Sequence, residues 1–257
     1  MASREENKTQ RRGEIIAAAR ALMQEPGNAA FSMRALAEQA GVSIATPYNL
    51  FGSKQAVLVS LLDDNLADYQ SHLSELTGTG ADALFEAIGL MCRLFAAEPD
   101  FYRNLISAVV TDSGPELKLL IGGPRYALWK LLLQKATEAG DLNPDADPDA
   151  FAVTLTQLLA ATVQEWALGS LGLKEMEARL RYALALTLCA IATERSARKL
   201  RTRLEAAEGD LQTLWRAALK RRLKEGPLDE HTRALLADQL KHLEEGATNR
   251  HRKETTA

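Results

Sequence analysis

Apolar residues recur at every third or fourth position along most of this chain, while the strict alternation of a half-buried strand is scarce. Ala, Leu, Glu and Arg, which all favour helices, dominate the sequence. Most prolines fall between the apolar repeats, where helices are expected to end. The pattern therefore predicts an all-α protein.

Two short helices joined by a tight turn are predicted between Phe31 and Lys54. Ser32 can cap the first helix, because its hydroxyl can accept a hydrogen bond from a free backbone N–H of the first turn. Gly41 follows the last apolar position of this helix and can adopt the left-handed conformation that ends helices. The inward face of the first helix is predicted to consist of Met33, Leu36, Ala37 and Ala40.

The second helix is predicted from Ile44 to Phe51, with Ser43 as its cap and with Pro47, Leu50 and Phe51 facing inward. Its length of roughly 12 Å is close to the width of a B-DNA major groove, about 12 Å. No acidic residue occurs from position 42 to position 52, which suits contact with a polyanion. These features indicate a helix-turn-helix whose second helix reads DNA. The alternative is an ordinary helical hairpin inside an all-α core.

Three stretches near the N-terminus carry a family resemblance: RRGEIIAAARALMQEPG, FSMRALAEQAGVS and ATPYNLFGSKQAVL. Together they resemble the three-helix DNA-binding domain of the TetR (tetracycline-repressor-like) family over about the first 65 residues. The resemblance implies a homodimeric transcriptional regulator, expected to be a repressor, that binds a palindromic DNA operator. It also implies a helical second domain that encloses a small-molecule effector of unknown identity. Pro47 departs from the family, which usually has a bulkier apolar residue there.

The candidate DNA contacts lie on the outer side of this head. Ile44, Ala45 and Asn49 are expected to face base edges, and Thr46 and Tyr48 to position the helix on phosphates. Lys54 sits in the first turn of the next helix, where free N–H groups bind phosphate, and the resemblance implies the same role. The full predicted set is Arg34, Ser43, Ile44, Ala45, Thr46, Tyr48, Asn49 and Lys54.

Three units are expected: a DNA-binding head over 1–54, a helical effector-binding and dimerisation domain over 55–197, and a helical extension over 198–257 with a disordered tail. Residues 1–9 are also predicted to be disordered, and the helix before position 139 to be interrupted at Gly122–Pro124. A long helix from Gln55 to about Leu76 is expected to join the head to the domain below.

Two strongly apolar helices, between 148 and 194, must be covered on more than one side. They are either buried within one chain or paired with a second copy, and the family resemblance favours the second copy. The predicted dimer contacts are Leu155, Leu158, Leu159, Leu180, Leu184 and Leu188.

Aromatic and amide side chains of the middle domain are candidates for an apolar effector pocket, although for each one taken alone packing in the core is the favoured role. The predicted ligand contacts are Phe95, Phe101, Tyr102, Asn104, Trp129, Gln157 and Trp166, with Gln164 as a further polar group.

The resemblance does not account for the last sixty or so residues. An apolar stripe including Leu200, Leu204 and Leu211, interrupted at Gly209, predicts an amphipathic helix, and Asp229 can cap another. Basic residues interleaved with acids occupy the outer faces. We expect this hairpin to pack against the dimer contact or the acidic middle domain, with a second DNA contact as the alternative.

Charge and chemistry refine this interpretation. The net charge of −3 conceals a head with 7 basic and 5 acidic residues, a middle domain (61–196) with 10 and 19, and an extension with 14 and 10. No metal-ligand spacing, phosphate loop or catalytic motif occurs, so we expect no cofactor, no metal and no enzyme activity. The alternative function is an all-α carrier or enzyme that does not bind DNA. The absence of a leader or an 18-residue apolar run predicts a cytoplasmic protein with no membrane partner.

Overall fold

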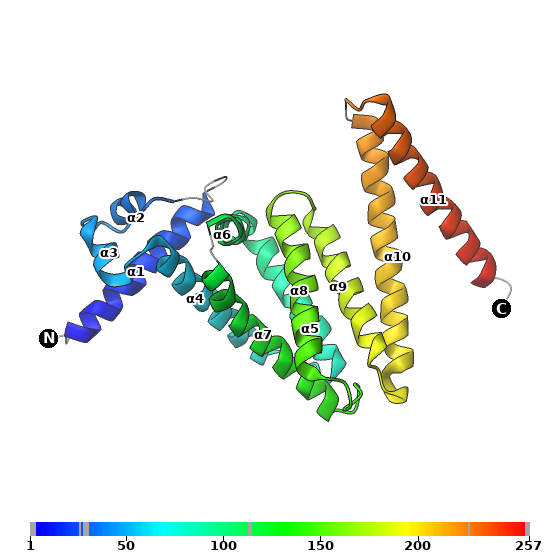
Figure 1. Ribbon diagram of the computed structural model, residues 1–257, viewed down its shortest axis with the longest axis horizontal. Helices are drawn as coiled ribbons and strands as arrows, with labels where there is room; N and C mark the ends of the chain where they lie inside the picture. Colours follow the sequence, from blue (N-terminus) through cyan, green and yellow to red (C-terminus); the bar gives the residue numbers. More distant parts are fainter. Residues whose placement is uncertain (1–3, 26, 28–30, 113–114, 226, 255–257) are drawn as a thin grey trace.

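The computed structural model describes residues 4–25, 27, 31–112, 115–225 and 227–254, and every named element in these ranges is an α-helix (Figure 1). The all-α prediction is confirmed. In chain order the helices are α1 (Arg4–Gln24), α2 (Met33–Gln39), α3 (Ala45–Phe51), α4 (Lys54–Ser74), α5 (Ala81–Ala97), α6 (Pro99–Asp112), α7 (Pro115–Glu138), α8 (Pro148–Ala167), α9 (Leu173–Ala190), α10 (Glu194–Glu225) and α11 (Glu230–Glu254).

The N-terminal head consists of α1, α2, α3 and the first half of α4. Its core combines the apolar faces of these helices with Phe101 and Leu105 of α6, which reach into it from the neighbouring bundle. The most deeply buried members from the head itself are Ile15, Ala19, Met23, Leu36, Val57, Leu58 and Leu61. The head is therefore anchored to the rest of the protein through α4 and α6.

Helix α1 begins at Arg4, so the prediction that residues 4–9 are disordered is wrong; residues 1–3 lie outside the described part. Glu5 and Glu6 occupy the first turn, where acids favour the helix dipole. Glu14 accepts a hydrogen bond from Gln10 at 3.1 Å and pairs with Arg11 at 3.0 Å, which supports the next turns.

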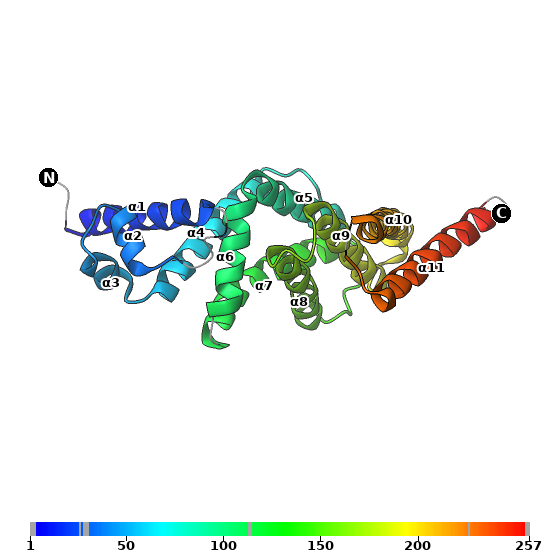
Figure 2. The same cartoon turned by 90° about the horizontal axis from the view of Figure 1, so that it is seen from above.

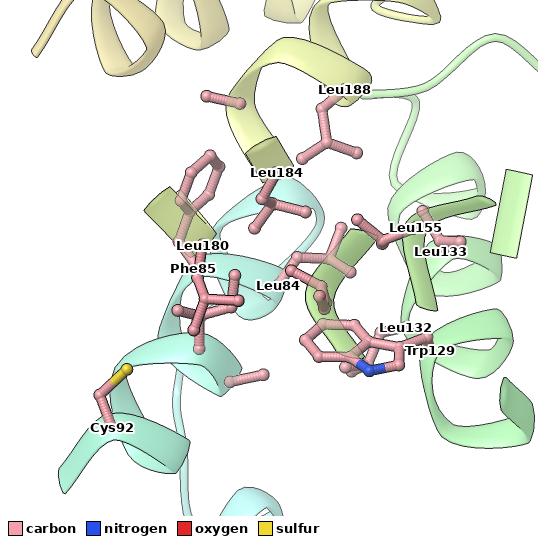
Figure 3. Close-up of a cluster of buried hydrophobic side chains, with 14 of the residues drawn as sticks. Leu84, Phe85, Cys92, Trp129, Leu132, Leu133, Leu155, Leu180, Leu184 and Leu188 are labelled. Carbon is pink, nitrogen blue, oxygen red and sulfur yellow. The ribbon is translucent and has the colours of Figure 1, made fainter. Parts of the chain in front are cut away.

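Helices α5 to α9 form a bundle around one large core (Figure 3). Leu84 and Phe85 of α5, Trp129 and Leu132 of α7, and Leu155 of α8 meet the apolar side of α9 there. Asp147 caps α8 through hydrogen bonds from the N–H groups of Asp149 and Ala150, at 2.9 and 3.1 Å, with Pro148 following at the first helical position.

The predicted break in α7 at Gly122–Pro124 is wrong, since the helix runs through Pro124. A proline inside a helix removes one hydrogen bond. The buried face formed by Leu128, Trp129, Leu132 and Leu133 beyond it provides packing that keeps the helix continuous. Likewise, α10 continues through Gly209. A glycine inside a helix costs only about 1 kcal/mol relative to alanine, and the burial of Ala207 and Leu211 beside it stabilises the helix there.

Helix α10 packs along α9, and α11 packs along α10 while projecting away from the bundle (Figures 1 and 2). Arg203 of α10 pairs with Asp82 of α5 at 2.6 Å, and Lys199 contacts the same carboxylate. Burial acts to raise the pKa of Asp82, but these two cations outweigh it and lower the pKa. Trp215 of α10 also donates from its indole nitrogen to Glu175 of α9 at 3.1 Å.

The predicted dimer face requires correction. Leu155, Leu180, Leu184 and Leu188 are fully buried and Leu159 is 4% exposed, all inside the core of a single chain. These side chains are therefore unavailable to a second copy. Leu158 differs, with 43% of its surface exposed.

Candidate nucleic-acid interface and ligand cavity

The turn between α2 and α3 is fixed by local hydrogen bonds. The Ser32 hydroxyl accepts a hydrogen bond from the N–H of Ala35 at 3.0 Å, as its predicted capping role requires. Gly41 has a φ of 64°, and the N–H of Val42 donates back to Ala37 at 2.9 Å. A glycine suits this conformation because a side chain would strain it.

Helix α3 begins at Ala45 with Ile44 at its cap position, one residue later than predicted. Ser43 does not cap it through its side chain; its hydroxyl lies 2.9 Å from the hydroxyl of Thr46. Pro47 is buried against the head, as its predicted inward position requires. Because a proline in the first helical turn lacks only an N–H that is free there anyway, it is compatible with this position.

The outer face of α3 is open. Ile44 is 53% exposed and Tyr48 is 50% exposed, and Ala45 and Asn49 are also exposed. No acidic residue occurs in the sequence of α3. The face thus combines apolar, phenol and amide groups without a carboxylate that phosphates would repel. It lies at the opposite end of the molecule from α10 and α11 (Figure 1).

Arg12 holds the C-terminal end of α3 in place. Its guanidinium donates to the carbonyl of Leu50 and lies over the ring of Phe51, with 4.1 Å to the ring centroid. Sequence reasoning missed this contact. Helical spacing places Leu50 and Phe51 on the inward face of α3, but it does not indicate that a basic residue of α1 packs against them.

The two cationic residues predicted to contact DNA, Arg34 and Lys54, already have contacts within the head. Arg34 is strongly exposed and pairs with Glu38 at 3.0 Å, so a phosphate would have to compete with that carboxylate. Lys54 begins α4 directly after Ser53, whose hydroxyl caps the helix by accepting from Ala56 at 3.1 Å. The Lys54 ammonium lies 5.5 Å from the centroid of the Phe31 ring.

A cavity of about 180 Å³ lies between α4, α5, α6, α7 and α8. Of the predicted ligand contacts, it is lined by Phe95, Tyr102 and Trp129, together with the further polar group Gln164. Leu62, Asn65 and Tyr69 of α4 and Arg125 of α7 also line it, and sequence reasoning missed these four. The helical spacing of the apolar residues in α4 was the available signal.

The other predicted ligand contacts are placed elsewhere. Phe101 is buried in the head core beneath Arg20, whose guanidinium lies 4.2 Å from the ring centroid. The Asn104 amide donates to the carbonyls of Met23 and Glu25 at 3.0 and 2.8 Å and thereby holds the end of α1. Gln157 is exposed, and Trp166 is fully buried with its ring stacked 5.0 Å from that of Phe95.

The cavity wall is continuous with the contact between bundle and head. Leu62 and Leu105 line the cavity and also belong to the head core, and Tyr102 packs against both cores. Nearby, Arg20 of α1 pairs with Glu98 at 2.7 Å, and Gln24 donates to the same carboxylate at 2.9 Å. Burial acts to raise the pKa of Glu98, but the hydrogen bonds from Gln24 and Arg20 outweigh it and lower the pKa.

Two structural findings concern metal binding and membrane insertion. Among the described residues, no group of three His, Cys, Asp or Glu side chains is arranged to hold a metal ion. None of the described helices has a stretch apolar enough, over the length required, to cross a membrane.

Comparisons with known proteins agree with this geometry. Residues 15–61 match the family model described as "Bacterial regulatory proteins, tetR family". The HTH-type transcriptional repressor KstR2 of Mycobacterium tuberculosis is 26% identical over 150 residues, which are 54% of this chain and 72% of that protein.

Solved structures show the same fold. A TetR transcriptional regulator from Rhodococcus sp. RHA1 aligns with a TM-score of 0.59 at 23% identity, covering 71% of this chain and 98% of that one. Thermus thermophilus FadR, in complex with lauroyl-CoA, aligns with a TM-score of 0.58 at 21% identity, covering 71% of this chain and 96% of that one. The matched residues 15–61 span the last part of α1, all of α2 and α3, and the start of α4. Over these residues the chain is similar to the TetR family of bacterial regulatory proteins.

Proposed function

We propose that this protein represses transcription in the cytoplasm as a homodimer, which binds a two-fold symmetric operator through α3 and releases it when a small molecule occupies the cavity. The observation that carries the DNA-binding part is the outer face of α3, where Ile44, Ala45, Tyr48 and Asn49 are exposed while Pro47 is buried. A family match over the same helices supports it.

The residues on this face suit the roles expected of them. The Asn49 amide can form a bidentate contact with adenine, and Ile44 and Ala45 can contact a thymine methyl group. Tyr48 and Thr46 can position the helix on phosphates, as can Lys54 from the first turn of α4 and Arg34 once it leaves Glu38. A dimer would place two such faces on successive turns of the duplex.

The DNA-binding proposal is tested by selecting duplexes from a random library with the purified protein. We expect a palindrome whose half-site centres lie about one helical turn apart, or a multiple of it. Lys54→Ala should weaken binding to all sequences alike and lower the salt slope by about one. Failure to enrich any sequence would favour the alternative, an all-α protein whose helical hairpin does not bind DNA.

The proposed effector site rests on the position of the cavity. Its wall includes α4, which continues from the head, and α6, which contributes Phe101 and Leu105 to the head core. A ligand that fits only one arrangement of these helices would shift the population of head positions, since a ligand moves an equilibrium through its differential affinity for the two states. The repressors KstR2 and FadR are consistent with this scheme, and FadR was solved with an acyl-CoA ligand.

The proposed dimer contact uses surfaces left open by the single chain. Val153 and Leu158 of α8 and Leu186 of α9 are 45%, 43% and 49% exposed. Exposed apolar side chains on neighbouring helices are common at protein–protein contacts. A two-fold axis beside α8 and α9 would present the same patch from both copies.

A further inference from the structure

The cavity wall contains polar side chains, and most of them are already engaged by the protein. The Tyr69 hydroxyl donates to the carbonyl of Ala87 at 2.8 Å, and the Thr156 hydroxyl donates to the carbonyl of Ala152 at 2.7 Å. The Asn65 amide donates to the carbonyl of Leu61 at 2.7 Å and accepts from Arg20 at 3.3 Å. These groups need no ligand to satisfy them.

Arg125 is different. It lies one residue after Pro124 in α7 and lines the cavity, yet within the described part of the chain no carboxylate, carbonyl or aromatic ring contacts its guanidinium. Other arginines of the bundle have such partners: Arg179 pairs with Glu165 and Glu175, and Arg181 pairs with Glu177. Because no counter-ion within the described residues occupies it, the Arg125 guanidinium can pair with an anion that enters the cavity.

The surroundings of Arg125 are those of a group at a cavity wall. Its side chain keeps a large accessible surface, and yet the protein around it is dense enough that desolvation lowers the pKa of Arg125. A large accessible surface and a lowered pKa are both expected of a guanidinium that borders an open space inside the protein. An arginine still carries its charge at neutral pH.

Gln164 of α8 also lines the cavity, but at a different level from Arg125. Tyr126 and Lys130 of α7 contact Asp149 at the start of α8, so Arg125 is level with the first turns of α8, and Gln164 lies several turns further along that helix. The Gln164 side chain likewise has no hydrogen-bond partner among the described residues. The cavity therefore offers a guanidinium from α7, while the wall around it is lined mainly by leucine, valine, methionine and aromatic side chains.

We infer that the effector is an organic anion with an apolar body, whose acidic group is bound by Arg125. This inference rests on the proposed role of the cavity as the effector site. A guanidinium donates two parallel hydrogen bonds to a carboxylate or phosphate, and such charge-assisted bonds are among the stronger ones in proteins. The aliphatic and aromatic wall receives the body of the molecule, which is driven into it by the hydrophobic effect.

The cavity size restricts the body of the ligand. A cavity of roughly 150 Å³ holds benzene, so about 180 Å³ suits one ring or a short chain. We therefore choose octanoate and 3-phenylpropanoate as probes, with octanol and 3-phenylpropanol as neutral counterparts of the same shape. Octanoyl-CoA, whose charge lies on phosphates outside the acyl chain, distinguishes a free acid from a conjugate.

The experiment is calorimetric titration of the full-length protein with each probe, alongside thermal unfolding with the same ligands. We expect at least one of the three anions to bind more tightly than the matched alcohol and to raise the melting temperature. Arg125→Gln should weaken the binding of that anion by roughly 10- to 100-fold and leave the affinity for the alcohol unchanged. Arg125→Lys should retain part of the affinity because it keeps the charge.

Lys135→Gln is the matched control, since it removes an exposed cation from the last turn of the same helix, away from the cavity. It should change no probe's affinity. Equal binding of acids and alcohols, or an Arg125→Gln protein that binds the anion as wild type does, overturns the anion inference while leaving the cavity as an effector site. Binding of none of the probes also overturns it. Operator selection is unaffected by any of these results and tests the proposed function separately.

Discussion

The rings of Phe95 and Tyr102 lie 4.5 Å apart, and this contact joins the hydrophobic core of the bundle to that of the head. Two further rings extend this contact into a row of four aromatic side chains. The Trp166 ring centroid lies 5.0 Å from that of Phe95, and the Phe101 ring centroid lies 5.0 Å from that of Tyr102. Phe101 in turn lies beneath Arg20 of α1. Because Phe95 and Tyr102 also line the cavity, a ligand there would touch the aromatic row that connects the two cores.

Replacement of Tyr102 is expected to weaken the link between cavity and head. In Tyr102→Leu we expect the ratio of operator affinities without and with saturating octanoate to fall several-fold from the roughly 5- to 150-fold typical of allosteric coupling. Fluorescence anisotropy with labelled operator measures this ratio. Tyr126→Leu is the control, because Tyr126 contacts Asp149 and does not line the cavity. An unchanged ratio in Tyr102→Leu would show that the row does not carry the coupling.

Acid is expected to loosen the junction between α1 and the bundle through Glu98. Its pKa is lowered in the folded protein, so its contribution to stability is complete above the ordinary value of about 4.3 and is lost as the pH falls below it. Since the Arg20–Glu98 pair is about one-third exposed, we expect about 0.5–1 kcal/mol. Thermal unfolding from pH 7 to pH 3.5 should show a smaller acid-induced loss in Glu98→Gln than in wild type. Glu38→Gln, at an exposed pair, should retain the wild-type loss.

Two substitutions to arginine separate the surface from the core of the bundle. Leu184 is fully buried in one chain, so Leu184→Arg should destabilise folding by several kcal/mol whatever the state of assembly. Leu158 is 43% exposed, so Leu158→Arg should leave the fold intact and yield a monomer by analytical ultracentrifugation. A folded Leu158→Arg protein that remains dimeric would place the contact elsewhere.

Truncation distinguishes the two helices of the extension. Removal of all residues after Ala197 takes away Leu200, Ala207 and Leu211, which are buried, and should lower thermal stability strongly, since each lost leucine alone is worth about 2–5 kcal/mol. Removal of the residues after Glu225 deletes α11, which packs on α10, and should have a much smaller effect. Tenfold weaker operator binding by a shortened protein that is still dimeric and equally stable would instead indicate a DNA contact by the extension.

Local chemistry made the head predictable from sequence. Ser32 and Gly41 have the cap and turn geometry expected of them, because each of these roles depends only on residues a few positions away. The inward position of Pro47 also followed from helical spacing. Features that depend only on neighbouring residues can be predicted without knowledge of the tertiary fold.

Long-range packing was not predictable in the same way. Apolar spacing in α8 and α9 could not reveal that α5, α7 and α10 already bury Leu155 and Leu184, because a sequence does not say what covers a face. The same limitation hid the continuity of α10 through Gly209. Asn104 was mistaken for a ligand contact because an amide in an apolar helix can equally satisfy the end of another helix.

The proposed reading of DNA by the outer face of α3 can be tested with a matched pair of substitutions. Ile44→Glu and Leu168→Glu each place a carboxylate at an exposed apolar position, 53% and 58% exposed, one on α3 and one at the end of α8. Operator affinity should fall about tenfold or more for Ile44→Glu, because the new charge faces phosphates and base edges, and should be unchanged for Leu168→Glu. Equal operator affinity of Ile44→Glu and wild type, with both proteins folded, would contradict the assignment of α3 as the reading helix.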